Sequence, residues 1–194
     1  MGDRIVDVQK LWKAIYTGRI FPPTVRSGTA CLAEAETCPD RHLPVKVLFS
    51  PGHTLASITY VIGDAAFVHD TLFVPDSGSA RADFPGGSAA RLWRSIQDIL
   101  ALPDETRLFV GHDYQAGGRE PLWESTVAAQ KTGNIHLVAA RTEAEFVALR
   151  ETRDRTLPMP RLILHALQVN MNGGRLPDPE ANGRRYLKFP LDGL

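Results

Sequence analysis

Four short runs of β-branched and aromatic residues end abruptly at turn-forming residues, and this pattern limits the fold more than any other feature of the chain. Pro51-Gly52 must end the first run, because proline has no backbone N–H to give to a sheet. Gly63-Asp64 favours a tight turn, so the second and third runs are a predicted hairpin. We expect the four runs to be β-strands at residues 45–49, 58–62, 65–69 and 107–110.

Four other segments have the spacing or the capping residues of helices. Apolar residues recur every three or four positions over residues 4–16, and Ser88 is placed to cap a helix that ends before Pro103. Residues 142–145 have the capping-box pattern, and residues 160–171 form a run whose first proline suits a first helical turn. Because strands dominate the first half and helices the second, the expected class is α+β. Residues 20–43 show no clear periodicity and are expected to be irregular.

Length and charge exclude several classes of function. A chain of 194 residues suits one domain, 1–194, with a core of its own. With 22 basic and 22 acidic residues and no long basic run, nucleic acid is not an expected partner. No apolar stretch has the length of a signal peptide or a membrane span, so we expect a cytoplasmic protein without a membrane partner. Cys31 and Cys38 do not form a CxxC pair and are expected to be reduced thiols.

Three of the predicted strands deliver a metal-capable side chain where the chain leaves the sheet. These side chains are His53, Asp70 and His112. Two imidazoles and one carboxylate suit zinc or iron, and this set leaves open positions on Fe²⁺. The alternative is that each is an ordinary polar residue at the end of a strand. The residues alone leave both interpretations open.

The sequence around these three residues resembles the metallo-β-lactamase fold. The motifs are "SPGHT", "HDTLF" and "FVGHDY", in this order and with these separations. The segments "ARADFPGG" and "MPRLILHALQVNMNGG" are most similar to the glyoxalase II and iron-dependent persulfide dioxygenase branch. The resemblance covers residues 45–194 and extends more weakly through the opening helix.

This resemblance implies an αββα sandwich, in which helices enclose two sheets and metal binds at one edge. His53 would be the third metal-binding position, Asp70 the metal-binding carboxylate and His112 the last histidine. In the one-iron dioxygenases, the iron ligands are the first histidine of an HxHxDH motif, the PGHT histidine and the aspartate, and the position of His112 lies nearby. Arg81 matches an arginine that shapes the glutathione persulfide pocket, and Tyr114 matches a pocket tyrosine.

The HxHxDH motif is absent, although the chain has six histidines. The expected fold is therefore an N-terminally incomplete sandwich, and a site for Fe²⁺ or Zn²⁺ would keep only part of its ligands. His112 turned inward or a second polypeptide could replace the missing ligand. His69 stands where the family has glycine, and we expect it to point away from Asp70, because neighbouring strand residues face opposite ways. An exposed sheet edge and apolar face would favour a homo-oligomer or completion by a second chain.

Secondary roles follow for several neighbours. Asp83 is expected to pair with Arg81 or to orient a metal-bound histidine. Asp113 is expected either to brace its loop or to contact substrate. His136 and His165 are expected to be structural.

Two functional hypotheses remain. The first is a metal-dependent enzyme that acts on a small-molecule thiol, persulfide or thioester, either as an iron-dependent persulfide dioxygenase or as a hydrolase of the glyoxalase II type. The second is a non-catalytic homologue that serves as a binding or assembly subunit completed by a partner chain. An in-frame HxHxDH upstream of Met1 would indicate an internal start. The tryptophans at 93 and 123 are expected on helices, in the core or an interface.

Overall fold

The structure, a computed structural model, describes residues 4–13, 37–39 and 44–189. Its strands are β1 (Thr37–Pro39), β2 (Pro44–Phe49), β3 (Ile58–Ile62), β4 (Ala65–His69), β5 (Arg107–Val110) and β6 (Glu124–Thr126). Its helices are α1 (Ile5–Lys13), α2 (Ala89–Leu100), α3 (Val127–Gly133), α4 (Ile135–Ala139), α5 (Glu143–Asp154) and α6 (Ile163–Asn170), and a 3₁₀ turn, η2, spans Ala116–Gly118. The predicted α+β class is confirmed.

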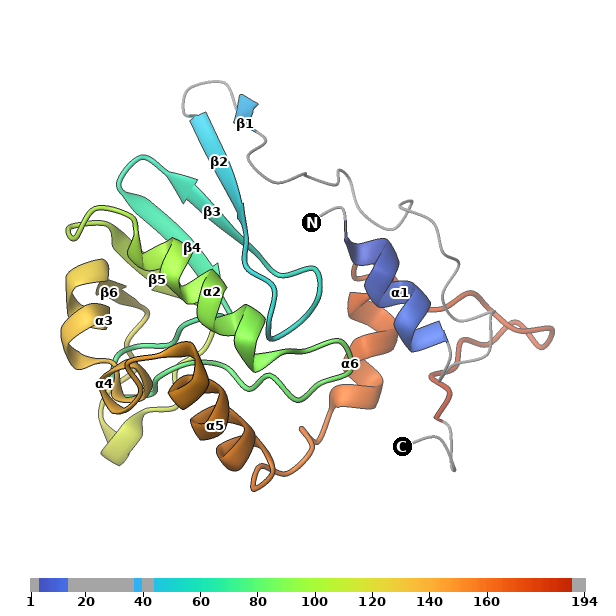
Figure 1. Ribbon diagram of the computed structural model, residues 1–194. Coiled ribbons are helices and arrows are strands. Elements are labelled where there is room, and N and C mark those ends of the chain that lie inside the picture. The colour runs from blue at the N-terminus through green and yellow to red at the C-terminus, as the bar shows by residue number, and fades with distance from the viewer. Residues whose placement is uncertain (1–3, 14–36, 40–43, 190–194) are drawn as a thin grey trace.

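The described strands form one six-stranded sheet in the order β1-β2-β3-β4-β5-β6 (Figure 1). Neighbouring strands are antiparallel except β4 and β5, which run parallel because α2 crosses between them. Since parallel strands end at the same edge, the residues that follow β4 and β5 emerge together. This connection brings Asp70 and His112 to one place.

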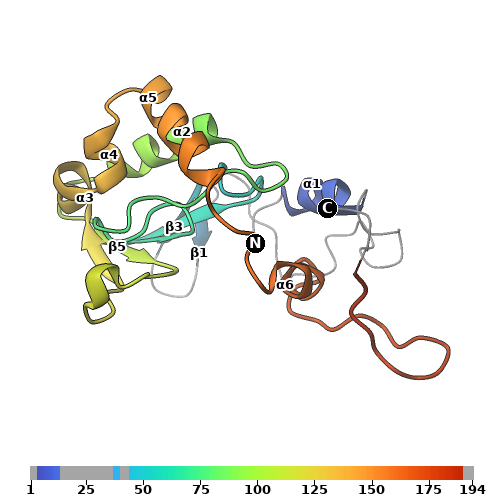
Figure 2. The ribbon, with the colours of Figure 1, turned by 90° about the horizontal axis from the view of Figure 1, so that it is seen from below.

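Helices cover one face of the sheet, and the main core lies between these helices and the sheet. Ala66, Val68 and Leu108 point from the strands toward Leu92 and Ile96 of α2, and all five are fully buried. Figure 2 shows α2 to α5 on this side. Burying a side chain of the size of leucine or isoleucine stabilises a fold by roughly 2 kcal/mol, so this contact fixes the sheet against α2.

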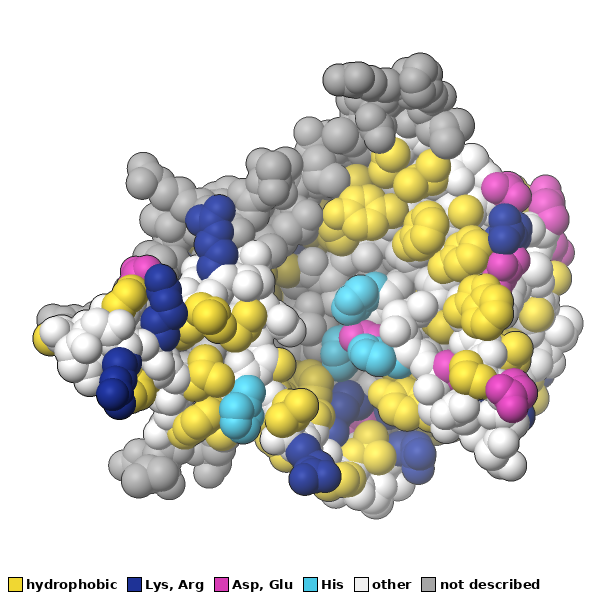
Figure 3. Space-filling model, turned by 180° about the vertical axis from the view of Figure 1, so that it is seen from behind, with side chains coloured by type: hydrophobic (Ala, Val, Ile, Leu, Met, Phe, Trp, Pro, Cys, Tyr) yellow, Lys and Arg dark blue, Asp and Glu magenta, His cyan; other side chains and the backbone are white. Residues whose placement is uncertain are grey.

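The opposite face of the sheet carries an apolar row. Tyr60 of β3, Phe67 of β4 and Phe109 of β5 are direct neighbours across the strands. Phe67 is 43% exposed, and its ring stacks on that of Phe109 with centroids 5.1 Å apart. Figure 3 shows hydrophobic side chains spread over this side of the molecule. Tyr60 and Phe109 are half-buried, so Phe67 is the exposed member of this aromatic row. An apolar side chain exposed in such a row is typical of a surface that another apolar layer covers.

A second, smaller core joins the two ends of the described chain. Ile5, Val8 and Trp12 of α1 pack with Met171 beside α6, and Gln9 donates a hydrogen bond to the Met171 carbonyl at 3.0 Å. Figures 1 and 2 both show α1 and α6 side by side, away from the other helices. In the part of the chain that the structure describes, no helix is both long enough and apolar enough to cross a membrane.

Most predicted elements are confirmed, including their caps. Ser88 caps α2 by accepting a hydrogen bond from the Arg91 amide, and Thr142 and Glu145 form both bonds of the capping box of α5. The first predicted helix is confirmed over Ile5–Lys13, and its last three residues lie outside the described ranges.

Three expectations were wrong in detail. Thr37–Pro39 is a strand paired with β2, because backbone pairing to a neighbouring strand needs no apolar periodicity. The last helix begins at Ile163 rather than at Pro160. Trp123 is not helical: its carbonyl accepts from the Val110 amide just before β6, and its side chain is exposed. The rest of the predicted irregular stretch, including Cys31, lies outside the described residues.

Gly52 sets the path of the loop that leads to His53, and its substitution should be costly. Its φ is +149°, and a Cβ there would lie 2.4 Å from the Leu92 Cα of α2. We expect Gly52→Ala to lower the free energy of unfolding by about 3 kcal/mol, through overpacking and backbone strain. The measurement is urea denaturation.

Gly63→Ala is the matched control. Gly63 also has a positive φ, of +59°, but a Cβ there would meet nothing within 4 Å. Its cost should be about 1 kcal/mol, from backbone conformation alone. Equal losses in the two variants would contradict the close packing of Gly52 against α2.

Candidate metal centre

The Asp70 carboxylate lies at the end of β4, and three histidines surround it. Its side chain is 13% exposed. His112 Nδ1 lies 2.5 Å from Oδ1, whereas His69 Nδ1 and His53 Nε2 lie 3.4 and 3.9 Å from Oδ2. Figure 3 shows histidine side chains gathered around an acidic one beside a hollow. The structure therefore brings together all three residues that the sequence singled out.

His53 is held by its other ring nitrogen. Its Nδ1 lies 2.8 Å from the backbone carbonyl of Arg81. Because a carbonyl only accepts, Nδ1 carries the proton in this contact, and Nε2, which has the free lone pair when the ring is neutral, faces Asp70. A histidine that donates one N–H to a carbonyl and offers the other nitrogen is the usual arrangement of a metal ligand. A cation between Nε2 and the carboxylate would satisfy both groups.

His112 reaches Asp70 from the loop after β5, and an arginine fork braces this loop. Arg119 donates to both carboxylate oxygens of Asp113 and of Asp76, at 2.6 to 2.7 Å. Asp113 also accepts from the Leu122 amide at 2.7 Å. Of the two roles predicted for Asp113, the structure shows the bracing one. Arg119 was not identified from the sequence, since an arginine that follows a glycine pair has no distinctive pattern.

The expectation that His69 points away from Asp70 was wrong. The pairing of β4 with β5 shifts register between Phe67 and His69, which breaks the simple alternation of the strand. His69 adopts a φ of +47°, a conformation that is strained for a residue with a Cβ. The imidazole stays largely exposed but turns toward the Asp70 carboxylate.

The ligand types at this centre fit Fe²⁺ or Zn²⁺, but there are too few of them for a complete metal site. Imidazole and carboxylate are suitable ligands for both metals. Within residues 4–13, 37–39 and 44–189, however, no group of three or more His, Cys, Asp or Glu has an arrangement that could hold a metal ion. His53 Nε2 and the Asp70 carboxylate face each other across 3.9 Å. His112 Nδ1 already contacts Asp70 directly.

A cleft of about 1290 Å³ adjoins this centre. It extends between the aromatic row of the sheet and the apolar sides of α1 and α6. His53, His69 and Asp70 line one part of it, and Arg175 is the only Lys or Arg among its described lining residues. The lining of the cleft is largely apolar beside these polar side chains, and Arg175 offers a cationic contact for an anionic group.

Arg81 is engaged within the protein. Its guanidinium donates to both oxygens of Asp83, at 2.6 and 2.7 Å, and to the carbonyl of Pro158 at 2.8 Å. Asp83 is its predicted partner, and the hydrogen bonds of this pair lower the pKa of Asp83. A substrate carboxylate would have to compete with these bonds. The part of Arg81 that touches the metal centre is its carbonyl.

Tyr114 lies outside the lining of the cleft. Its side chain is 68% exposed and meets the ring of Phe73 edge-on, with centroids 5.2 Å apart. Loss of solvent around the phenol, followed by the charge of Asp70, raises the pKa of Tyr114, whereas Arg81 lowers it. The hydroxyl is thus within electrostatic reach of the centre, and its contact with a substrate stays a prediction.

The remaining predicted structural histidines differ in burial. His136 is buried, and its Nδ1 accepts from the Ser79 amide at 2.8 Å, so its structural role is confirmed. His165 is an exposed residue of α6, and its ring lies 4.7 Å from that of Phe189. Trp93 lies on α2, as predicted, and packs on Phe146.

Histidines and a carboxylate meet at the strand ends of a mixed sheet that helices cover on one face. A family model described as "Metallo-beta-lactamase superfamily" matches residues 3–112. The chain belongs to this superfamily, and the resemblance predicted from its motifs is confirmed.

Curated relatives include a beta-lactamase hydrolase-like protein of Agrobacterium fabrum, which is 64% identical over 100% of this chain. The match covers 45% of that relative, so the chain spans about half of its length. Glyoxylase B2 of Dictyostelium discoideum is 40% identical over 100% of this chain and 67% of its own length. Among solved structures, ETHE1 from Myxococcus xanthus matches with a TM-score of 0.67 and 32% identity, over 78% of this chain and 65% of that one.

The bracing of the His112 loop predicts a pH dependence of stability. The hydrogen bonds from Arg119 hold the pKa of Asp113 well below its usual range. A carboxylate whose pKa is lowered on folding stabilises the protein fully above its unfolded pKa of about 3.9, and this contribution disappears as the pH falls below that value. We expect Asp113→Asn to be destabilised relative to the unsubstituted chain at pH 7, and the difference to shrink at about pH 3.

Denaturant titrations at several pH values provide the measurement. Asp98→Asn, which removes an exposed carboxylate of α2, controls for the change in net charge. A difference between Asp113→Asn and the unsubstituted chain that stays constant with pH would contradict the role of the Arg119 fork.

Proposed function

We propose that this chain forms part of a metal-dependent site that acts on a small-molecule thiol derivative, and that His53 and Asp70 hold its Fe²⁺ or Zn²⁺. The observation that carries the proposal is the arrangement of His53: Nδ1 is fixed by the Arg81 carbonyl, and Nε2 faces the Asp70 carboxylate across 3.9 Å. When bound, such a metal supplies Lewis-acid chemistry and, if it is iron, redox chemistry.

The contacts favour the persulfide dioxygenase type over the two-metal hydrolase type. In the one-iron dioxygenases that this sequence resembles, the PGHT histidine and the aspartate are iron ligands, and the last histidine lies nearby. Here His112 contacts Asp70 directly and orients it, which is consistent with that supporting position. The preferred substrate is therefore a low-molecular-weight persulfide such as that of glutathione, and a thioester is the alternative. The protein's own residues would orient the ligand and limit access of water at the cleft.

The metal content of the purified chain tests this proposal. After equilibration with Fe²⁺ or Zn²⁺, elemental analysis should find metal in the unsubstituted chain. We expect its affinity to fall at least about tenfold in the His53→Ala, Asp70→Ala double variant, because loss of supporting contacts alone typically costs 10- to 100-fold. His165→Ala, which removes an exposed histidine of α6, is the matched control.

Equal metal binding by the double variant and the unsubstituted chain would contradict the proposed centre. Retained binding in the control, together with O₂ uptake on glutathione persulfide that depends on His53, would support the dioxygenase type. Thioester hydrolysis without O₂ uptake would favour the hydrolase type instead.

A second candidate function is that of a non-catalytic subunit completed by another polypeptide segment. The exposure of Phe67 in the aromatic row favours it, since an apolar surface gains stability when a second apolar layer covers it. The chain lacks HxHxDH, which agrees with a site that needs a further segment.

The oligomeric state tests this second function. We expect light scattering coupled to gel filtration to show a dimer or larger species. Phe67→Lys should shift it toward the monomer, because burying a charge on this face is unfavourable. Lys46→Glu, at an exposed position of β2, is a charge-change control. A stable monomer at micromolar concentration would argue against this role.

A further inference from the structure

A buried ion pair on α5 is not explained by the proposed function. Arg150 and Asp154 are four residues apart on α5, are 2% and 4% exposed, and pair with each other. Burying two charges is expensive, and replacement of such a pair by apolar side chains of similar volume is often neutral or stabilising. Stability alone therefore does not account for the pair.

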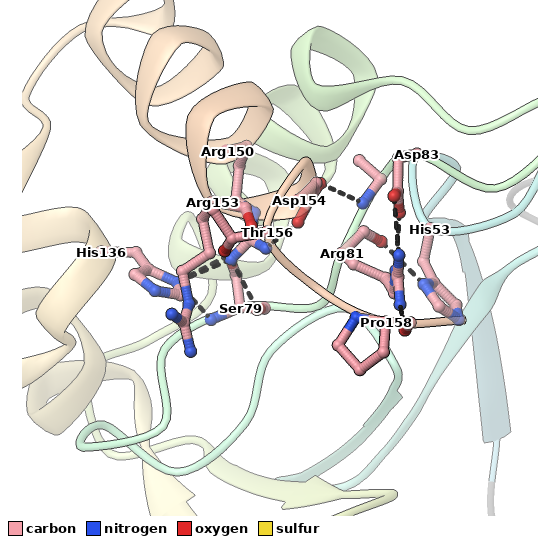
Figure 4. A network of polar contacts seen from close by, with 11 residues as sticks. His53, Ser79, Arg81, Asp83, His136, Arg150, Arg153, Asp154, Thr156 and Pro158 are labelled. Atoms are coloured by element: carbon pink, nitrogen blue, oxygen red, sulfur yellow. Dashed lines mark hydrogen bonds and ion pairs between the residues drawn. The ribbon is translucent and has the colours of Figure 1, made fainter. Parts of the chain in front are cut away.

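The pair holds the main chain of residues 79–83, here named the 79–83 segment. Asp154 accepts from the Ala82 amide at 2.8 Å, and Arg150 donates to the Ser79 carbonyl at 3.2 Å. His136, from α4, accepts from the Ser79 amide at 2.8 Å. Figure 4 shows these side chains converging on the segment from the helical side. Three buried side chains thus fix three peptide groups of one loop.

His136 is suited to this acceptor role at neutral pH. Burial, followed by the charges of Arg150 and Arg153, lowers the pKa of His136 to about 4. The imidazole is therefore neutral near pH 7, and its Nδ1 keeps the lone pair that the Ser79 amide needs. Arg150 Nη1 also lies 3.3 Å from this nitrogen, so a neutral ring is compatible with the neighbouring guanidinium.

The other side of the same segment holds His53. Arg81 lies between the two anchored residues, and its carbonyl accepts from His53 Nδ1 at 2.8 Å. Its guanidinium donates to the Pro158 carbonyl, just beyond α5. Figure 4 shows His53 on the far side of the segment from Arg150. A shift of the 79–83 segment would therefore move the group that sets the tautomer of His53.

We propose that Arg150 and Asp154 are positioning residues that fix the 79–83 segment so that the Arg81 carbonyl holds His53 with Nδ1 protonated and Nε2 directed at Asp70. The hydrogen-bond relay runs from α5 through the segment to His53. The effect of this relay on metal affinity rests on the proposed function. Its effect on the tautomer of His53 is independent of that function. The pair touches neither metal nor substrate and acts only through His53.

The test replaces the pair by apolar residues, in the double variant Arg150→Met, Asp154→Leu. The control is Arg94→Met, Glu143→Leu, which removes an exposed ion pair between α2 and α5. Long-range ¹H–¹⁵N spectra of histidine-labelled, metal-free protein near pH 7 report the tautomer of each ring, and His53→Gln assigns the resonance. Titration with Co²⁺ reports metal affinity, and thermal unfolding reports stability.

We expect the unsubstituted chain and the control to show His53 protonated at Nδ1. The buried-pair variant should show a mixture of tautomers and about tenfold weaker Co²⁺ binding, as for loss of an outer contact of a metal ligand. A folded buried-pair variant with an unchanged His53 tautomer overturns the proposal. If the unsubstituted chain binds no Co²⁺, the proposed function fails, and the tautomer alone decides this inference.

Asp154→Asn covers the case in which the double variant does not fold. Asparagine has the same shape but removes the charge that binds Arg150 and the Ala82 amide. A shift of the His53 tautomer in folded Asp154→Asn supports positioning, and an unchanged tautomer overturns it. Unfolding of both variants also overturns it, because the pair would then serve the fold as a whole.

Discussion

One hydrogen bond, from His53 Nδ1 to the carbonyl of Arg81, joins the two parts of the molecule that make the candidate centre. His53 follows β2, whereas Arg81 lies in the connection between β4 and α2. The bond fixes a ring that would otherwise rotate in its loop, and it assigns the free lone pair to Nε2. The approach of His53 to Asp70 depends on this orientation, because Nε2 and the carboxylate face each other across 3.9 Å only while the ring is held.

The surrounding structure positions both partners of that hydrogen bond. On one side, Gly52 lets the loop before His53 pass against Leu92 of α2, where no side chain would fit. On the other side, α5 holds the 79–83 segment through buried side chains. A precise site needs such support, since loops are positioned only as well as the elements on which they pack.

The two faces of the sheet have different roles. The face under α2 is a closed core, and the face with Phe67 and Phe109 borders the cleft at the metal-capable residues. Apolar groups around a metal-capable carboxylate lower the local dielectric constant and strengthen electrostatic contacts there. The aromatic row of the sheet is therefore also a wall of the cleft at the candidate site. A second apolar layer over this row would at the same time enclose the site.

Local sequence determined the strands β2 to β5, the caps of α2 and α5, and the placement of His53, Asp70 and His112 at strand ends, because turn residues, capping residues and apolar spacing act within a few positions of the chain. Tertiary structure alone decided the side-chain directions. A register shift between β4 and β5 turned His69 toward Asp70, and Thr37–Pro39 became a strand only by pairing with β2. Arg119 contacts Asp76, and Asp154 contacts the Ala82 amide, across long stretches of the chain. These partners follow from packing and burial, which no local pattern encodes.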